Sequence, residues 1–139
     1  MLYYGQDALW AFGEGMRIFK NKAFARFARK ARLEDSALRQ AVSDVERGLI
    51  DADLGGGVVK QRIARAGGGK SGGFRTVILF RLHEKAFFVH GFAKNEQDNI
   101  RDNELAALKL LATEMMAYDD EALARATANG TLMEVMCND

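Results

Sequence analysis

Cationic side chains stand an even number of positions apart in each of two consecutive apolar segments of this 139-residue chain. Lys60 and Arg62 stand in the first segment, and Arg75 and Arg81 stand in the second. Because side chains alternate between the two faces of a strand, each pair shares one face. A buried, unpaired Lys or Arg is costly, so these cations indicate a groove for a polyanion such as a nucleic-acid backbone. The alternative interpretation is an exposed face whose charge prevents edge-to-edge aggregation.

A third segment adds further chemistry at its end, where His90, Phe92 and Lys94 share one face. The ring of Phe92 could support RNA by stacking against a base. His90 fits two descriptions, a partly buried strand histidine or a general base. Arg65 and Lys70 lie at the loop that joins the first two segments, so they extend the basic surface.

That loop contains ARAGGGKS at residues 64–71, which resembles a phosphate-binding loop, and it also fits a G-x-G-x-x-G pattern. Both nucleotide motifs require a helix directly after the glycines, because the helix N-terminus binds the phosphates. Here the next residues are FRTVILF, whose alternation and β-branched side chains are typical of a strand. The sequence therefore predicts a turn between two basic strands and no nucleotide cofactor. Within such a turn Lys70 can reach a phosphate as a point charge.

Composition points to one globular domain, with 28% charged and 48% hydrophobic residues. Cys137 is the single cysteine, so it cannot form an intrachain disulfide, and it has no neighbouring metal ligands. We expect a cytoplasmic protein without a metal or other cofactor. The N-terminal residues lack the pattern of a signal peptide, and no apolar run is long enough for a membrane span.

The charge is unevenly distributed along the chain. Residues 16–101 hold 18 Lys and Arg against 9 Asp and Glu, whereas residues 102–139 hold 2 against 8. A basic body with an acidic tail indicates either a polyanionic partner or an acidic protein partner.

Periodicity predicts a small α+β domain. A strand at residues 16–20 leads to a helix capped by Asn21, and a second helix begins at Asp35 or Ser36. Strands follow at residues 58–65, 74–82 and 85–93, then two helices from residues 102–103 and 119–120, and an edge strand at 131–136. We expect an antiparallel sheet with an N-terminal helical hairpin and C-terminal helices packed against it. The segment DADLGGG at 51–57 is interpreted as a break. The first helix is basic, with Arg26, Arg29 and Lys30.

The segments GGGVVKQRIAR, GGGKSGGFRTVILFR and FFVHGFAKNEQDNI resemble the RelE/ParE superfamily of bacterial toxins, in particular its RelE-like (HigB-like) branch. The opening MRIFKNKAFARFARK and the late L-x-E-V sequence are similar to the same branch. The resemblance extends over residues 16–136. We therefore divide the chain into a leader of open status (1–15) and a RelE-like toxin domain (16–139).

The resemblance implies a toxin of a type II toxin-antitoxin system that cleaves mRNA on the ribosome by metal-free attack of the RNA 2′-OH. It also implies a helix-turn-helix antitoxin as partner. Lys60, Arg62 and Arg75 would meet the cleaved phosphate, with Lys94 beside them, and the first helix would dock on ribosomal RNA. Similar toxins often carry a Tyr at the site. No Tyr stands near Lys94, and His90 could take its place, so the general base stays unassigned.

The candidate catalytic residues are Lys60, Arg62, Arg75, His90 and Lys94. The candidate RNA-binding residues are Arg26, Arg29, Lys30, Arg65, Lys70, Arg81 and Phe92. Two other functions remain open, a non-catalytic toxin of the gyrase-inhibiting ParE type and a simple RNA-binding module.

Overall fold

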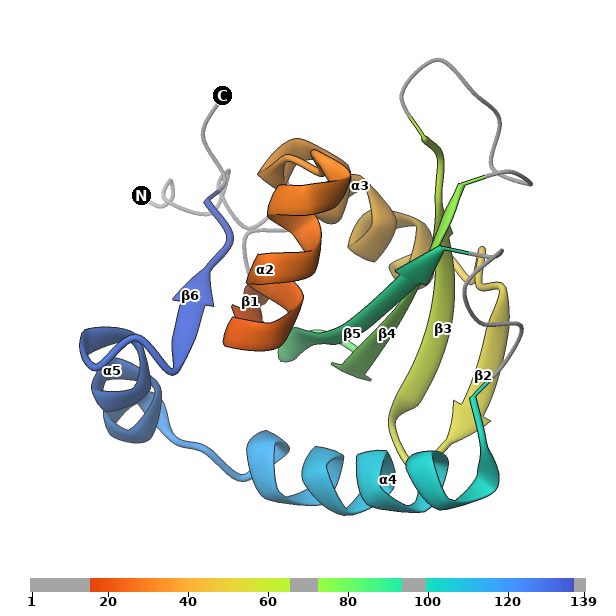
Figure 1. Ribbon diagram of the computed structural model, residues 1–139. Helices are drawn as coiled ribbons and strands as arrows, with labels where there is room; N and C mark the ends of the chain where they lie inside the picture. Colours follow the sequence, from red (N-terminus) through yellow and green to blue (C-terminus); the bar gives the residue numbers. More distant parts are fainter. Residues whose placement is uncertain (1–15, 66–72, 94–99, 137–139) are drawn as a thin grey trace, which may run out of the picture.

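The computed structural model describes residues 16–65, 73–93 and 100–136. The proposed leader, Lys70, Lys94 and Cys137 lie outside these residues. The described residues form an α+β domain in which helices lie on both faces of one sheet (Figure 1). The predicted fold class is confirmed.

The sheet has six strands in the order β2-β3-β4-β5-β1-β6. Their bounds are β1 Arg17–Asn21, β2 Ala52–Gly55, β3 Val58–Ile63, β4 Phe74–Arg81, β5 Lys85–Ala93 and β6 Leu132–Glu134. Strands β2 to β5 are antiparallel neighbours, but β1 runs parallel to β5. The expectation of a wholly antiparallel sheet is therefore wrong. Short turns enforce antiparallel pairing, whereas the two helices that follow β1 free its direction.

Strand β2 lies where the sequence was interpreted as a break. It pairs with β3 through a turn in which Gly55, Gly56 and Gly57 have φ angles of 87°, 61° and 83°. Glycine adopts positive φ without the steric cost that other residues meet. The glycines therefore make a hairpin turn, and the preceding ADL is too short and too polar to show a strand period.

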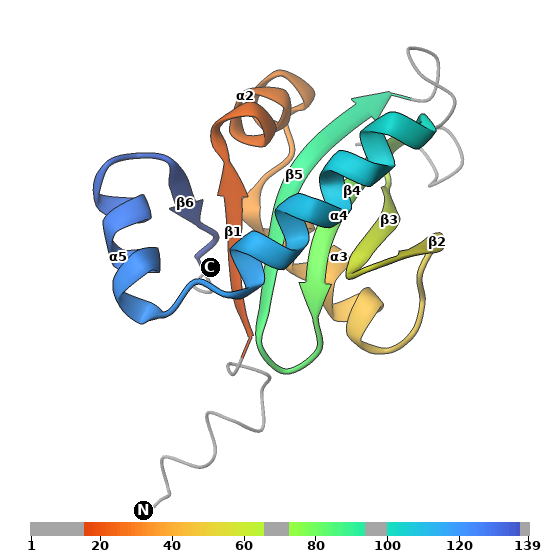
Figure 2. The ribbon, with the colours of Figure 1, turned by 90° about the horizontal axis from the view of Figure 1, so that it is seen from below.

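Four helices occur in the described part of the chain. They are α2 Lys22–Ala31, α3 Asp35–Glu46, α4 Asp102–Met116 and α5 Asp120–Ala128. The Asn21 side chain accepts a hydrogen bond of 2.8 Å from the Phe24 N–H, as the capping prediction requires. Helices α2 and α3 pack on one face of the sheet, and α4 crosses the other, as Figure 2 shows from below.

Each face of the sheet has its own apolar core. The α2–α3 face buries aromatic and branched side chains, including Phe24, Leu38, Val42, Ile78 and Phe88. The α4–α5 face buries a second group, including Phe19, Val77, Phe87, Met115 and Leu123. Because β4 is buried on both faces, it is apolar along most of its length and anchors both cores.

Helix α2 approaches β5 closely at Gly91. A Cβ atom added to Gly91 would lie 2.4 Å from the Phe27 ring, which is far inside van der Waals contact. The same ring meets Phe74 edge to face, with centroids 5.6 Å apart. Gly91 therefore sets how deeply α2 packs against the cation-bearing end of the sheet.

We expect Gly91→Ala to lower the free energy of unfolding by about 1–3 kcal/mol, because the added methyl group overpacks the helix–sheet contact. Urea denaturation of both proteins measures this change. In a Gly91→Ala, Phe27→Leu double variant the clash is relieved, so the cost should be smaller than the sum of the two single costs. Additive costs would show that Phe27 does not set the constraint.

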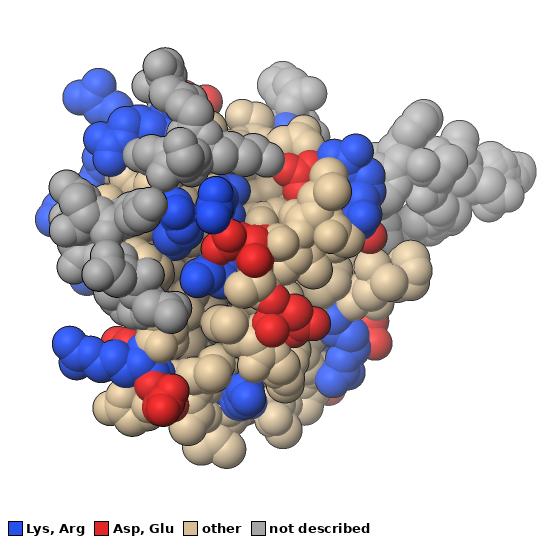
Figure 3. All heavy atoms as spheres, turned by 90° about the vertical axis from the view of Figure 1, so that its right-hand side faces the viewer, with Lys and Arg blue, Asp and Glu red and all other residues tan. Residues whose placement is uncertain are grey.

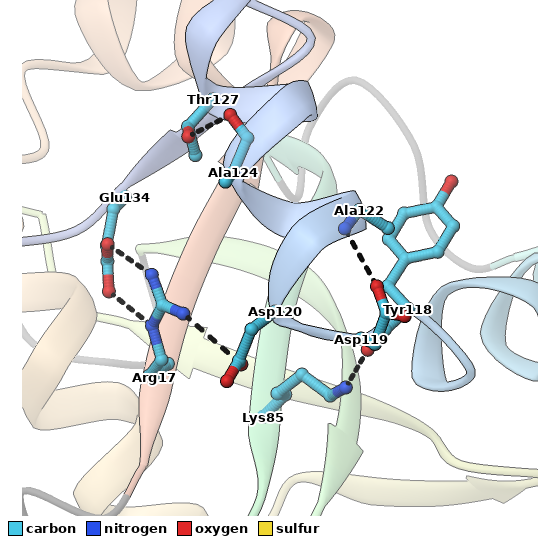
Figure 4. A network of polar contacts seen from close by, with 9 residues as sticks. All are labelled: Arg17, Lys85, Tyr118, Asp119, Asp120, Ala122, Ala124, Thr127 and Glu134. Atoms are coloured by element: carbon cyan, nitrogen blue, oxygen red, sulfur yellow. Dashed lines mark hydrogen bonds and ion pairs between the residues drawn. The ribbon is translucent and has the colours of Figure 1, made fainter.

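The C-terminal elements are tied to the sheet by ionic contacts. The Arg17 guanidinium binds both carboxylate oxygens of Glu134 at 2.9 Å and lies 3.9 Å from Asp120 (Figure 4). Lys85 donates to the Tyr118 carbonyl at 2.6 Å in the same view. These contacts hold β6, α5 and the end of α4 against β1 and β5.

Asp35, in the first turn of α3, makes a second such anchor. Its carboxylate accepts from the Lys20 ammonium at 3.0 Å and from the Met136 N–H at 3.1 Å. Burial favours the neutral form of Asp35, but these two hydrogen bonds and the charges of Lys20 and Arg39 together outweigh it, so the pKa of Asp35 lies below its ordinary value. The ionised carboxylate therefore stabilises the fold.

Because the pKa of Asp35 is lower in the folded state, its contribution is complete above the pKa of the unfolded chain. It is lost as the pH falls through the folded value, that is, below about pH 4. We expect Asp35→Asn to melt at a lower temperature than the parent at pH 7, and the difference to shrink toward pH 2. Thermal melts over this range test the expectation, and a difference that is independent of pH would contradict it.

Candidate functional site

The register of three strands brings the predicted cations together. Arg62 pairs with Arg75, which pairs in turn with Phe92. Two residues along the ladder, Lys60 pairs with Val77, which pairs with His90. Directly paired residues project to the same face, so these side chains share the face that α4 covers farther along. We call Lys60, Arg62 and Arg75 the cation cluster.

A β-bulge in β5 brings His90 to this face. Val77 pairs with His90, but its neighbour Ile78 pairs with Phe88, so Val89 is an extra residue. Strict alternation would place His90 on the face of Phe88, which belongs to the core under α2 and α3. The bulge re-aims His90 toward the cation cluster, and bulges often act in this way beside functional sites.

Arg75 is the most buried member of the cluster. It is 7% exposed, and its Nη1 atom is buried and has no hydrogen-bond partner among the described residues. A buried donor without a partner costs free energy. Such an orphaned group is typical of a ligand site, where an incoming oxyanion supplies the acceptor.

The other two cations share one carboxylate. Asp51 Oδ1 accepts from Arg62 Nε at 2.9 Å, and Asp51 Oδ2 lies 3.7 Å from Lys60 Nζ. The Arg62 side chain remains 44% exposed, whereas those of Lys60 and Asp51 are 17% and 14% exposed. A surface hollow of about 400 Å³ lies beside this pair, lined by Asp51, Arg62 and the segment before them. Arg62 is thus the cation of the cluster most accessible to a ligand.

Buried polar groups on the opposite face support the cluster. Gln61 is 4% exposed and donates to the carbonyls of Leu49, at 2.8 Å, and Ala41, at 3.4 Å. Its side-chain oxygen accepts from the Asp51 N–H at 3.1 Å. The Thr76 hydroxyl donates to the Gln61 carbonyl at 3.0 Å. These bonds fix the segment that carries Asp51 against β3.

The remaining basic candidates lie in two other places. The Arg65 guanidinium lies over the Phe74 ring, 4.9 Å from its centroid, and this ring contacts Phe27 of α2. It therefore lies toward α2, whose exposed basic residues include Arg26, Arg29 and Lys30. Arg81 lies six residues from Arg75 along β4, about 20 Å away, and pairs with Glu84 at 3.6 Å. The structure does not bring Arg81 to the cation cluster.

Two aromatic residues remain to be placed: Phe92, a candidate for stacking on RNA, and Tyr118, the single tyrosine among the described residues. Phe92 is 4% exposed and contacts the His90 ring, with centroids 5.6 Å apart, so its ring is not presented to solvent. Tyr118 contacts Lys85, at the opposite end of β5 from His90. Burial and the neighbouring Glu114 carboxylate raise the pKa of the Tyr118 phenol. Tyr118 therefore does not supply the tyrosine missing from the cluster.

Sequence reasoning missed Asp51 and Gln61. Gln61 stands between two outward cations in an alternating strand, so it must face the core, where a polar side chain requires partners. The position of Gln61 between Lys60 and Arg62 was therefore the signal in the sequence that it is buried and hydrogen-bonded. No local pattern marks Asp51, because it lies outside β2 and reaches Lys60 and Arg62 only when the strands pair.

Figure 3 shows the side of the molecule that carries β2 and β3, where Lys and Arg side chains lie at several places with Asp and Glu side chains between them. No group of three or more His, Cys, Asp or Glu side chains placed to hold a metal ion occurs in the described residues. None of their helices is long and apolar enough to cross a membrane.

The described residues therefore form a small α+β domain with a mixed sheet and a cation cluster on one face of that sheet. The family model of the RelE toxin of the RelE/RelB toxin-antitoxin system matches residues 16–135. The chain belongs to the RelE toxin family, and membership implies an antitoxin partner. A comparison with curated proteins found no match.

We expect Arg75→Met to raise the free energy of unfolding by about 1 kcal/mol, because it removes a buried charge with an unpaired donor and keeps most of the side-chain volume. Chemical denaturation of the two proteins measures the difference. Arg81→Met serves as the control and should change stability little, because the Arg81 side chain is 54% exposed and its ion pair with Glu84 is exposed too. A large loss of stability in Arg75→Met would show that the guanidinium serves the fold.

Proposed function

We propose that this toxin is a ribosome-dependent mRNA endonuclease. The observation that carries the proposal is the buried Arg75 guanidinium, whose Nη1 lacks a partner in the described structure, directly opposite Arg62 in the sheet. Two adjacent guanidinium groups offer N–H donors in the planar arrangement that matches phosphate oxygens. With Lys60 they would neutralise a phosphodiester that carries extra negative charge in its transition state.

The proposed reaction is a transesterification within the RNA. The 2′-OH attacks the adjacent phosphorus, so a bond forms between phosphorus and O2′ and the bond from phosphorus to O5′ breaks. One product ends in a 2′,3′-cyclic phosphate and the other begins with a 5′-OH. A base accepts the 2′-OH proton, and an acid supplies a proton to the departing O5′.

We assign the roles as follows. Arg75 and Arg62 stabilise the pentavalent phosphate, and Lys60 and Lys94 add positive charge. His90 shares the face of Lys60 through their common partner Val77, so it is the candidate for proton transfer. Imidazole suits this role because its ordinary pKa lies close to physiological pH.

Binding of the larger RNA surface falls to residues outside the cluster. The exposed cations of α2 (Arg26, Arg29 and Lys30) would contact ribosomal RNA, with Arg65 on the same side of the sheet. Lys70 lies outside the described residues and stays a candidate, whereas Arg81 lies at the far end of β4 and Phe92 is buried, which leaves both less accessible to the RNA at the cluster. The proposed partners are the ribosome with its mRNA and a helix-turn-helix antitoxin, in the cytoplasm.

Induced expression in bacteria tests this function. We expect growth arrest together with cleavage of mRNA at translated codons, and we expect Arg75→Ala to reduce cleavage about 10²–10³-fold, the size of effect seen when a transition-state donor is removed. Melting of the purified variant checks that it folds. A DNA-damage response without mRNA cleavage would instead identify a gyrase-inhibiting toxin, and RNA binding without toxicity would identify an RNA-binding module.

The ends of the cleaved RNA test the chemistry separately. We expect 2′,3′-cyclic phosphate and 5′-OH termini. A single 2′-deoxynucleotide on the 5′ side of the cleaved bond should abolish cleavage without weakening binding. Products that carry a 5′-phosphate would rule out attack by the 2′-OH.

A further inference from the structure

Asp51 is a carboxylate placed between two cations of the proposed site. It accepts from Arg62 Nε at 2.9 Å and lies 3.7 Å from Lys60 Nζ. The Asp51 side chain is only 14% exposed, so water screens these contacts less than it would on an open surface. The ion pair with Arg62 is therefore partly buried, since the Arg62 side chain is itself 44% exposed.

The backbone of Asp51 is also fixed by a hydrogen bond. The Asp51 N–H donates to the buried amide of Gln61, which also binds the carbonyl of Leu49. Directly after Asp51 the chain enters β2, where Ala52 pairs with Lys60. The carboxylate is therefore placed by β3 itself, the strand that carries the cations.

Arg62 requires such a partner because of its position in the sheet. It stands directly opposite Arg75, and like charges at opposed positions of an antiparallel pair repel each other. A long, exposed arginine beside another cation would turn toward solvent unless an anion held it. Asp51 engages only the Nε edge of Arg62, so the outer Nη edge of the guanidinium lies outside this contact.

We propose that Asp51 is a positioning residue of the RNA-cleaving site, one that orients Arg62 and Lys60 for the scissile phosphate without touching it. This inference rests on the proposed function. It explains why an acidic side chain lies within a surface that binds a polyanion. Asp51 weakens the attraction of the site for RNA in general but fixes the donors in the geometry that the transition state requires.

The test compares Asp51→Asn with the parent in cleavage of mRNA on programmed ribosomes. We expect the kcat of Asp51→Asn to fall at least about tenfold, because misplaced donors stabilise the transition state less. Its affinity for an uncleavable single-stranded RNA, with 2′-O-methyl nucleotides throughout, should stay equal or become tighter, because a negative charge is removed. Asp53→Asn is the matched control, since Asp53 is exposed and its carboxylate binds the Gly55 N–H. It should keep the parent kcat.

A second variant covers the case in which Asp51→Asn folds poorly. Arg62→Lys keeps the charge but lacks the Nε donor, so it should show a similar loss of kcat. Adding Asp51→Asn to it should then cause little further loss. Unchanged kcat in Asp51→Asn would overturn the proposal, and so would a loss of kcat and RNA affinity that only follows a lower melting temperature.

One measurement separates this proposal from the proposed function. The Nε–H proton of Arg62, observed by NMR in the free protein, should exchange slowly in the parent and Asp53→Asn and rapidly in Asp51→Asn. If the parent cleaves no RNA, the endonuclease function fails, and slow exchange would still show that Asp51 orders Arg62. If the parent cleaves RNA but Arg62 exchanges equally fast in all three proteins, the role of Asp51 fails alone.

Discussion

The pairing of β3 with β4 places two arginines directly opposite each other, and the rest of the site follows from that register. A shift of one residue would send Arg62 or Arg75 into the core beneath α2 and α3, which packing forbids. The register is thus secured by apolar residues on both faces of β4, among them Val77, Ile78 and Leu79. Core packing therefore holds the like charges together.

Keeping these cations close together destabilises this part of the folded protein, and the neighbouring residues offset the effect only in part. Asp51 neutralises part of the charge near Lys60 and Arg62, while Arg75 keeps a buried Nη1 without a partner in the described structure. Functional sites commonly retain such unfavourable features because a ligand relieves them. In this RelE-family chain the unpaired donor lies at one end of β4, and the two cores elsewhere consist mainly of apolar side chains, with Gln61 and Thr76 hydrogen-bonded among them.

The strand order also separates charges of opposite sign. Strand β6 and the acidic residues beside it lie at one edge of the sheet, beyond β1, and β2 with β3 form the opposite edge. Glu134 is already engaged with Arg17 at that distant edge. Glu134 therefore helps to anchor β6 at the edge of the sheet that lies farthest from β2 and β3.

The sequence by itself determined the fold class, most of the strands and helices, and the shared face of Lys60 and Arg62, because alternation and capping are local properties. It also determined that a strand follows the glycine-rich loop, since FRTVILF has a strand's period wherever it packs. Only the tertiary structure decided the parallel placement of β1, the strand hidden before the three glycines, and the face of His90. The face on which His90 lies depends on a bulge in β5, because the extra residue Val89 moves His90 to the other face of the sheet without changing the sequence pattern. The tertiary structure also decided the contacts of Asp51, because its carboxylate reaches Lys60 and Arg62 only after the neighbouring strands β2 and β3 have paired.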